Sequence, residues 1–138
     1  MDKYKLQAKN FLKSANAEMK IAFIGTEVNG RWNDTEPRNK YRFTITTPKG
    51  KMEGVFWDSI YNTRKNSKES PTEYDILACL EKYDVGTMDD FMAEFGYEIK
   101  SATDMSNFIF TYNAVQKEYR DLCRIFTEEQ MEELREIQ

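Results

Sequence analysis

The densest set of side chains that could bind a ligand is a group of carboxylates near the end of the chain. It consists of Glu118, Asp121, Glu128, Glu129, Glu132, Glu133 and Glu136. Carboxylates hold a metal ion only where their oxygens converge from fixed positions. These residues instead follow a helix surface, mostly at spacings of three and four, so the pattern favours a solvated face or a face that binds a basic protein.

A second pattern points to nuclease chemistry. Glu98 and Lys100 have the E-x-K spacing of a metal-dependent nuclease core, and the third acid would be Asp84, Asp89 or Asp90. That core needs its residues on adjacent strands, whereas this pattern falls between two predicted helices. The chain has no histidine, which removes Ser-His-Asp and Cys-His catalysis, histidine general bases and histidine-ligated metals. We therefore expect a non-enzymatic protein without catalytic residues, metal or cofactor.

Basic residues gather in the first half of the chain. Four should lie near one end of a predicted hairpin, and the others in flanking loops together with a tryptophan. The set is Arg31, Trp32, Arg38, Lys40, Arg42, Lys49, Lys51, Arg64 and Lys65. Lysine, arginine and aromatic side chains suit single-stranded nucleic acid, through phosphate contacts and base stacking.

The alternation of this hairpin limits which aromatic residues could stack on bases. Tyr41 and Phe43 alternate away from Lys40 and Arg42, so a sheet with one buried face hides both rings. Only Trp32 or Trp57 (outside the core) could then stack. An ordinary solvated basic face and an acidic protein partner are the alternative interpretations.

The predicted elements that carry these groups fall into a basic half and an acidic half of the chain. Residues 1–69 carry 14 Lys and Arg against 8 Asp and Glu, a net charge of +6; residues 70–138 carry 6 against 16, a net charge of −10. We expect one domain over residues 1–138, with a basic helix and β-meander followed by an acidic helical part. Such a bipolar molecule suggests charged partners.

The first half reads as one helix and three strands. Apolar residues recur at helical spacing from Tyr4 to Ala15, and Asn16 should end that helix. Strands are expected over 19–28, 40–47 and 51–57, with a turn at 47–50 that contains Pro48 and Gly50. The 58–69 stretch is polar and basic.

The second half reads as helices with recognisable caps. Ser70 should cap the first, Thr87 the second and Ser101 or Thr103 the third, with Gly96 as a left-handed cap. Residues 127–130 form another capping box. The predicted core stripe of the long third helix is Met105, Phe108, Ile109, Tyr112, Val115, Tyr119, Leu122 and Phe126. We also place Met88, Met92 and Met131 in the core.

The fold class is therefore α+β: an N-terminal helix, a three-stranded antiparallel meander, then three or four C-terminal helices packed on one sheet face. Cys79 and Cys123 are expected as buried free thiols in the cytoplasm of a bacterial host. Purely apolar runs, such as the one at 21–24, are far short of the roughly 20 residues of a membrane helix. The oligomeric state is left open.

Four stretches of the sequence carry a resemblance. They are 41–59, 74–83, the F-x-x-E-F-G-Y segment at 91–97, and the F-T-x-E-Q-x-E-x-L segment at 126–134. They resemble small uncharacterised proteins of bacterial phages and integrative elements, over about two thirds of the chain. The resemblance provides no catalytic motif. It implies an origin on a mobile element, where small acidic proteins often bind and disable host machinery, including CRISPR nucleases.

Two functional hypotheses follow, from different classes. The first is a non-enzymatic protein that inhibits a host defence complex, most concretely a CRISPR effector nuclease, through DNA mimicry by its acidic helix. Its contact residues would be Asp121, Glu128, Glu129, Glu132, Glu133 and Glu136. The second is an accessory nucleic-acid-binding protein of phage replication or recombination that uses the basic hairpin. A carboxylate-only nuclease is a distant third.

Overall fold

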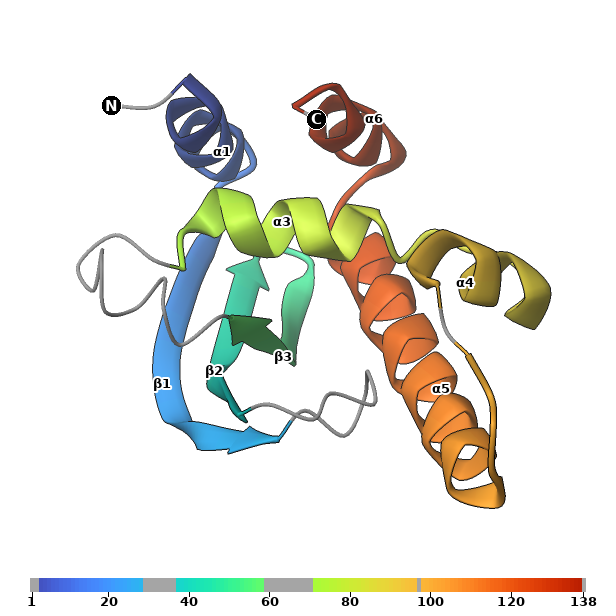
Figure 1. The fold of residues 1–138 in the computed structure, drawn as a ribbon. Helices are drawn as coiled ribbons and strands as arrows, with labels where there is room; N and C mark the ends of the chain where they lie inside the picture. Colours follow the sequence, from blue (N-terminus) through green and yellow to red (C-terminus); the bar gives the residue numbers. More distant parts are fainter. Residues whose placement is uncertain (1–2, 29–36, 59–70, 97, 138) are drawn as a thin grey trace.

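The computed structural model describes residues 3–28, 37–58, 71–96 and 98–137. Its elements in chain order are α1 (Lys3–Ser14), β1 (Glu18–Val28), β2 (Pro37–Thr47), β3 (Gly50–Asp58), α3 (Glu73–Glu81), α4 (Met88–Phe95), α5 (Ala102–Ile125) and α6 (Glu128–Glu136). This confirms the α+β class and the predicted order of elements (Figure 1).

The three strands form one antiparallel sheet in the order β1-β2-β3. Tyr41, Phe43 and Ile45 on β2 are buried, while Arg42 and Thr46, at alternate positions, are exposed, as expected for a strand with one face in the core. Gly50 follows the turn with a φ of 148°, a backbone conformation that favours glycine.

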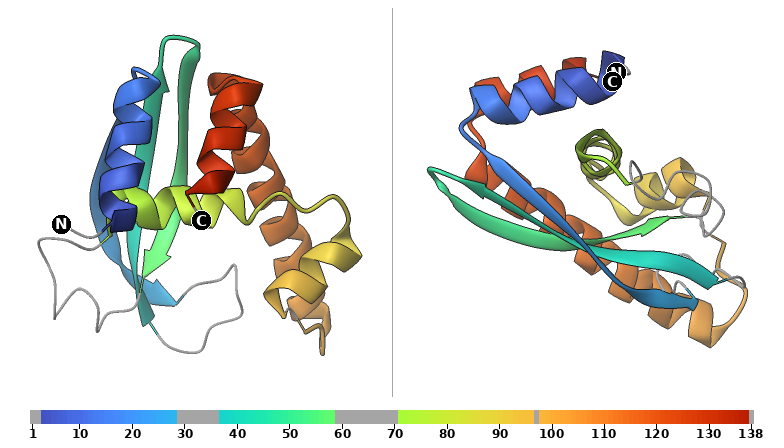
Figure 2. Two further views of the ribbon diagram at one scale, coloured as in Figure 1. Left: turned by 90° about the horizontal axis from the view of Figure 1, so that it is seen from above. Right: turned by 90° about the vertical axis from the view of Figure 1, so that its left-hand side faces the viewer.

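The helices cover the face of the sheet that carries the buried β2 residues (Figure 2). In the common core, α1 contributes Phe11, α3 contributes Leu80, and α5 contributes Leu122, beside Phe43 and Met52 of the sheet. The opposite face carries the alternating polar residues of the strands. Among the described residues, no helix is long and apolar enough to cross a membrane.

Local capping chemistry sets most of the helix ends. Thr87, Ser101 and Thr127 each accept a hydrogen bond from the backbone N–H three residues later, so these predicted starts are confirmed. Gly96 closes α4 in the left-handed conformation at φ 62°, also as predicted. The predicted cap at Ser70 is wrong.

The cap of α3 is Thr72, and Asp75 completes a reciprocal capping box with it. The Asp75 carboxylate accepts from the Thr72 backbone N–H at 2.8 Å, while the Asp75 N–H donates to the Thr72 hydroxyl at 3.4 Å. The T-x-x-D spacing satisfies two orphan helix donors at once, which explains why α3 begins two residues later than predicted.

Several residues predicted for the core are exposed instead. Met88, Met105 and Ile109 are more than two-fifths exposed, because α4 covers only part of the N-terminal half of α5. The described contact there is aromatic: Phe91 packs against Phe108 and Tyr112, at 5.7 Å between ring centroids in each case. The remaining apolar side chains at this end of α5 extend past that contact.

The two cysteines also differ from the expectation of buried thiols. Both are free, Cys79 is half-buried and Cys123 is exposed on α5. Cys123 follows the fully buried Leu122 by one helical position, which turns it about 100° away from the core.

Candidate protein-binding and nucleic-acid-binding surfaces

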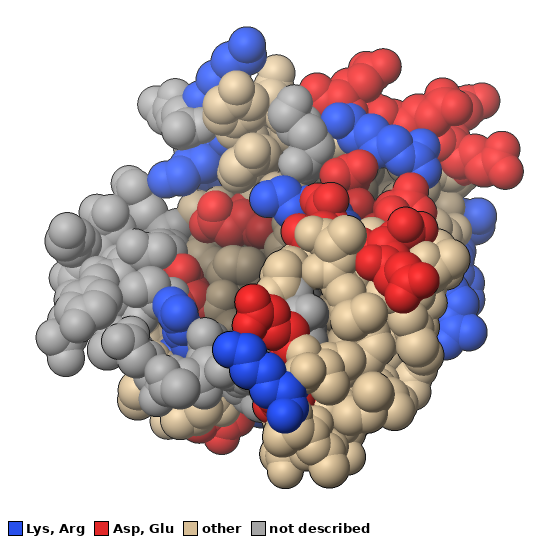
Figure 3. Space-filling view, turned by 45° about the vertical axis from the view of Figure 1, so that its right-hand side comes forward, with Lys and Arg blue, Asp and Glu red and all other residues tan. Residues whose placement is uncertain are grey.

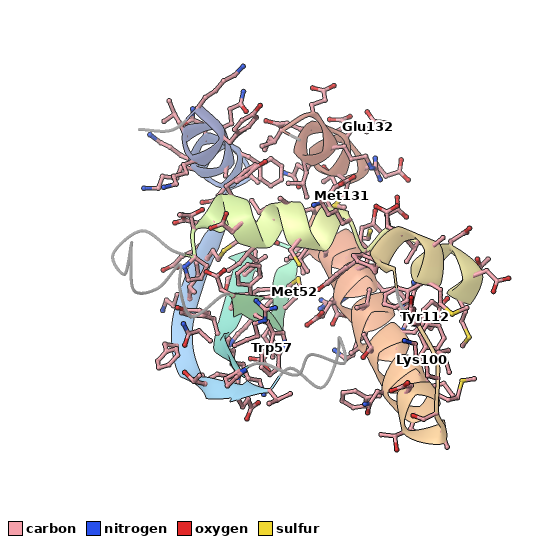
Figure 4. All side chains as sticks on the ribbon, viewed as in Figure 1. Met52, Trp57, Lys100, Tyr112, Met131 and Glu132 are labelled. Carbon is pink, nitrogen blue, oxygen red and sulfur yellow. The ribbon has the colours of Figure 1, made fainter. Side chains whose placement is uncertain are left out.

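The short helix α6 is fixed to the molecule at its start and along one face. Thr127 and Gln130 form a capping box, with the Gln130 N–H donating to the Thr127 hydroxyl at 3.1 Å. Met131, Leu134 and Ile137 are buried. Figure 4 shows Met131 between α6 and α3, whereas its neighbour Glu132 lies on the outer side of α6. One face of α6 is therefore fixed and the other is presented to solvent.

The outer face of α6 is mostly acidic. All five of its glutamates are exposed, and none has a cation within 4 Å among the described residues: Glu128, Glu129, Glu132, Glu133 and Glu136. Acidic side chains gather at the upper right of the molecule, where α6 lies (Figure 3). We refer to these five glutamates as the acidic face.

The one cation on α6 is engaged elsewhere. The Arg135 guanidinium donates a hydrogen bond of 3.5 Å to the Tyr119 hydroxyl of α5. Burial raises the pKa of Tyr119 to about 12, so its hydroxyl stays neutral and can accept this bond. The bond to Tyr119, together with the carboxylates of Asp84 and Glu81, raises the pKa of Arg135. Arg135 therefore connects α6 to α5.

Two acids that the sequence grouped with the acidic face have different surroundings. The carboxylate of Asp121, on α5, lies 2.8 Å from the Lys117 ammonium and 3.7 Å from the Arg124 guanidinium. Glu118 is only 5% exposed and accepts a hydrogen bond of 3.1 Å from the Val55 backbone N–H. Its helical spacing suggested a surface acid, but it faces the edge of β3.

The role of α5 as an edge cover of the sheet is the main feature that the sequence analysis missed. Besides the Glu118 contact, Arg124 donates to the Lys51 carbonyl at 3.0 Å and the Thr47 hydroxyl donates to the Ile125 carbonyl at 2.7 Å. Gly54 makes room for the approach, because a Cβ there would lie 2.6 Å from a Glu118 oxygen. The buried glutamate thus provides one of the acceptors that a fourth strand would otherwise supply along β3.

The face of the sheet that no described helix covers (the uncovered face) brings together part of the predicted nucleic-acid site. Lys40 and Trp57 are cross-strand partners, and the Lys40 ammonium lies 5.0 Å from the centre of the Trp57 ring. The indole Nε1 of Trp57 is buried and has no hydrogen-bond partner among the described residues. Arg42 is exposed on the same face. A cation beside an aromatic ring is typical of single-strand binding sites.

The expectation that four basic residues share one end of the hairpin is wrong. Lys40 pairs with Trp57, but Lys51 pairs with Thr46, six residues further along β2. At the rise of a strand this separates them by roughly 20 Å. Lys49 lies in the turn beside Lys51. The predicted turn at 47–50 already implies this separation, because Lys51 directly follows the turn whereas Lys40 lies seven residues before it.

Acidic residues also interrupt this basic face. Glu53 lies opposite Thr44, between the two basic ends. The Glu27 carboxylate lies 2.8 Å from the Lys40 ammonium. Arg38, on β2, is half-buried. The predicted residues Arg31, Trp32, Arg64 and Lys65 lie outside the described residues.

The E-x-K pair lies in the link between α4 and α5, as its sequence context predicted. Glu98 and Lys100 form an ion pair of 3.1 Å, with both side chains more than 70% exposed. Within the described ranges, no three His, Cys, Asp or Glu side chains are grouped so that they could hold a metal ion.

The acidic face and the basic sheet face thus have different local chemistry. The acidic face is unneutralised and rigidly held, while the basic face is divided by acids. No family model matches the chain, and neither a curated protein nor a solved structure does. The geometry of the surfaces therefore carries the functional argument.

Proposed function

We propose that this chain is a non-enzymatic binding protein that blocks a basic, nucleic-acid-binding surface of a partner protein. The single observation that carries the proposal is the acidic face: five exposed, unneutralised glutamates on a helix whose other side is buried. A helix fixed in this way presents its charges in a set arrangement, much as a nucleic-acid strand presents its phosphates.

The stability of α6 does not account for this pattern. Glu128 and Glu129 lie in the first turn, where carboxylates interact favourably with the helix dipole. Glu132, Glu133 and Glu136 lie beyond it, and like charges four residues apart each cost a few tenths of a kcal/mol. A basic partner provides a reason for these three residues.

The class of partner follows from the charge and from the resemblance to phage and mobile-element proteins. The most concrete candidate is a CRISPR effector nuclease, which holds nucleic acid in a positively charged channel. Complementary charge would chiefly speed association and make it dependent on salt. The inhibitor would act by occupying the channel and excluding DNA or guide RNA.

The test compares capture of basic proteins from a bacterial lysate by the parent chain and by a variant with Glu128, Glu129, Glu132 and Glu133 changed to Gln. The parent should capture a nucleic-acid-binding protein and block its DNA or guide RNA, with capture that weakens as salt rises. The neutralised variant should lose both effects while keeping its thermal unfolding transition.

A matched control neutralises four exposed glutamates on other elements, namely Glu18, Glu53, Glu94 and Glu98. It changes the net charge by the same amount and should retain capture. If the α6 variant binds and inhibits as well as the parent, the acidic face is only solvated and the proposal is wrong. Equal loss in both variants would indicate general charge attraction and would also contradict it.

A second candidate function is single-strand nucleic-acid binding on the uncovered sheet face, favoured by the Lys40–Trp57 pair. Reversing the charge at Lys40, Arg42, Lys49 and Lys51 should abolish retention of single-stranded DNA, and binding should fall steeply with salt. No retention by the parent at about 50 mM salt, where such contacts are strong, would exclude this function.

A further inference from the structure

The outer edge of β1 is the one long backbone edge of the sheet to which no described element is bonded. β1 has 11 residues and stands at the end of the order β1-β2-β3. Figure 2, in its right-hand view, shows β1 nearest the viewer, with no described helix or strand in front of it. Phe23, Ile24 and Val28 along it are 58%, 42% and 50% exposed.

An edge of this length with exposed apolar side chains is suited to accept another strand. A second copy of this chain is the simplest donor, because a two-fold axis allows each β1 to be both donor and acceptor. Whether the charges on β1 permit such pairing depends on the register.

An irregularity in β1 decides which registers are possible. The pairing with β2 shifts between Phe23 and Gly25, so β1 contains one extra residue there. In a regular strand Lys20 and Glu27 point to opposite faces, because they are an odd number of residues apart. The extra residue brings both to the same face.

Contacts with β2 confirm this arrangement of faces. The Glu27 carboxylate accepts a hydrogen bond of 2.8 Å from Lys40, on the uncovered face. Lys20 lies opposite Thr44, an even number of residues from Lys40 on β2 and hence on the same face. The Thr26 hydroxyl instead donates to the buried Asn39 side chain at 2.8 Å, on the core side.

We infer that two copies of this chain associate by antiparallel pairing of their β1 strands, with Lys20 of each copy opposite Glu27 of the other. Partners across an antiparallel ladder point to the same face, and this register meets that requirement for Lys20 with Glu27, Ile21 with Thr26 and Ala22 with Gly25. It places two ion pairs symmetrically about the axis and sets Met19 opposite Val28 on the core side. The two sheets become one of six strands.

Neighbouring registers that keep the faces matched are worse. A shift in one direction places Glu18 opposite Glu27, a like-charge pair that is destabilising across strands. A shift in the other direction places Ala22 opposite Glu27 and removes both ion pairs. Of these three registers, the charges on β1 favour the one that pairs Lys20 with Glu27. This inference does not depend on the acidic face of α6.

The test measures the molecular mass of the full chain by analytical ultracentrifugation over a concentration series, for the parent and for Lys20→Glu and Glu27→Lys variants. The parent should show a monomer–dimer equilibrium. Each single reversal should weaken self-association about tenfold or more, since it replaces two attractive cross-strand pairs by two repulsive ones. The double variant, Lys20→Glu with Glu27→Lys, should restore the dimer.

Mixing the two single variants gives the most specific readout. A chain with Glu at both positions and a chain with Lys at both positions form two favourable pairs with each other, so a heterodimer should appear where neither variant dimerises alone. Lys51→Glu, an exposed reversal on β3, is the matched control and should leave the dimer intact.

Three outcomes would overturn the inference. They are a monomeric parent at every concentration, a dimer that Lys20→Glu leaves unchanged, and a pair of single variants that fails to form a heterodimer. Lys20→Glu alone keeps the test decisive if Glu27→Lys, which also removes the contact with Lys40, fails to fold. A β1 that pairs only with a strand of another protein would give the first of these outcomes.

Discussion

The backbone groups on the two outer edges of the sheet, along β3 and β1, have different partners. Along β3, helix α5 supplies a buried carboxylate for the Val55 N–H and a guanidinium for the Lys51 carbonyl. Along β1, the described residues supply no such partners, and the apolar side chains of Phe23, Ile24 and Val28 are exposed. The comparison shows that a helix can complete one edge of a sheet by side-chain hydrogen bonds while the opposite edge stays open for association.

The largest loss of stability is expected from a substitution that fills the space between β3 and α5. In Gly54→Ala the new Cβ would lie 2.6 Å from both the Phe43 ring and a Glu118 oxygen, so the buried Phe43 ring and the Glu118 carboxylate must shift. We expect a loss of about 2–3 kcal/mol in the free energy of unfolding, measured by urea denaturation. In the control Gly86→Ala, nothing lies within 4 Å of the new Cβ. A neutral Gly54→Ala would show that α5 does not approach β3 so closely.

The next largest loss of stability is expected from replacing Glu118, the buried acceptor of the Val55 N–H. Glu118→Leu keeps much of the side-chain volume but leaves the Val55 N–H without its acceptor, which should cost about 1–3 kcal/mol. Glu118→Gln retains a carbonyl oxygen and should cost less. Equal unfolding free energies for both variants would mean that the hydrogen bond to β3 contributes nothing.

A smaller effect is expected at the turn end of the covered edge. Thr47→Val removes the hydroxyl that donates to the Ile125 carbonyl and accepts from the Lys49 N–H, and should cost about 1 kcal/mol. The adjacent Thr46→Val, on the exposed face, is the control and should change the unfolding free energy by less than about 0.5 kcal/mol. Similar values for the two variants would contradict the contact with α5.

The smallest change in stability is expected from a substitution on the outer edge of β1. Val28→Thr in dilute solution should change the unfolding free energy by less than about 0.5 kcal/mol, because half of the Val28 side chain is already exposed. A loss above about 1 kcal/mol would show that this edge is packed in the monomer, and the difference between the two edges would disappear.

Local signals in the sequence predicted most of the fold. The alternation of Tyr41 and Phe43 placed the buried face of the hairpin, and the T-x-x-Q box and Gly96 placed two helix ends. These features depend on residues only a few positions apart. The exposed glutamates of α6 could be predicted for the same reason, since Met131 and Leu134 define the opposite side of that helix.

Contacts between distant residues could not be predicted in this way. Glu118 reads as one more surface acid, and only its approach to Val55, 63 residues away, makes it a buried acceptor. Met105 and Ile109 continue an apolar stripe, but α4 is too short to cover them.

The contact between α5 and β3 also has a consequence for the order of events on the ribosome. A hairpin such as β2–β3 forms within about 1–10 μs once both strands have emerged. The Thr47 hydroxyl, however, can bind the Ile125 carbonyl only after a further 78 residues have been synthesised. At about 5–20 residues per second, this synthesis takes several seconds. During that interval the nascent sheet has two open edges, and a chaperone or a neighbouring chain can reach a surface that the finished protein has hidden.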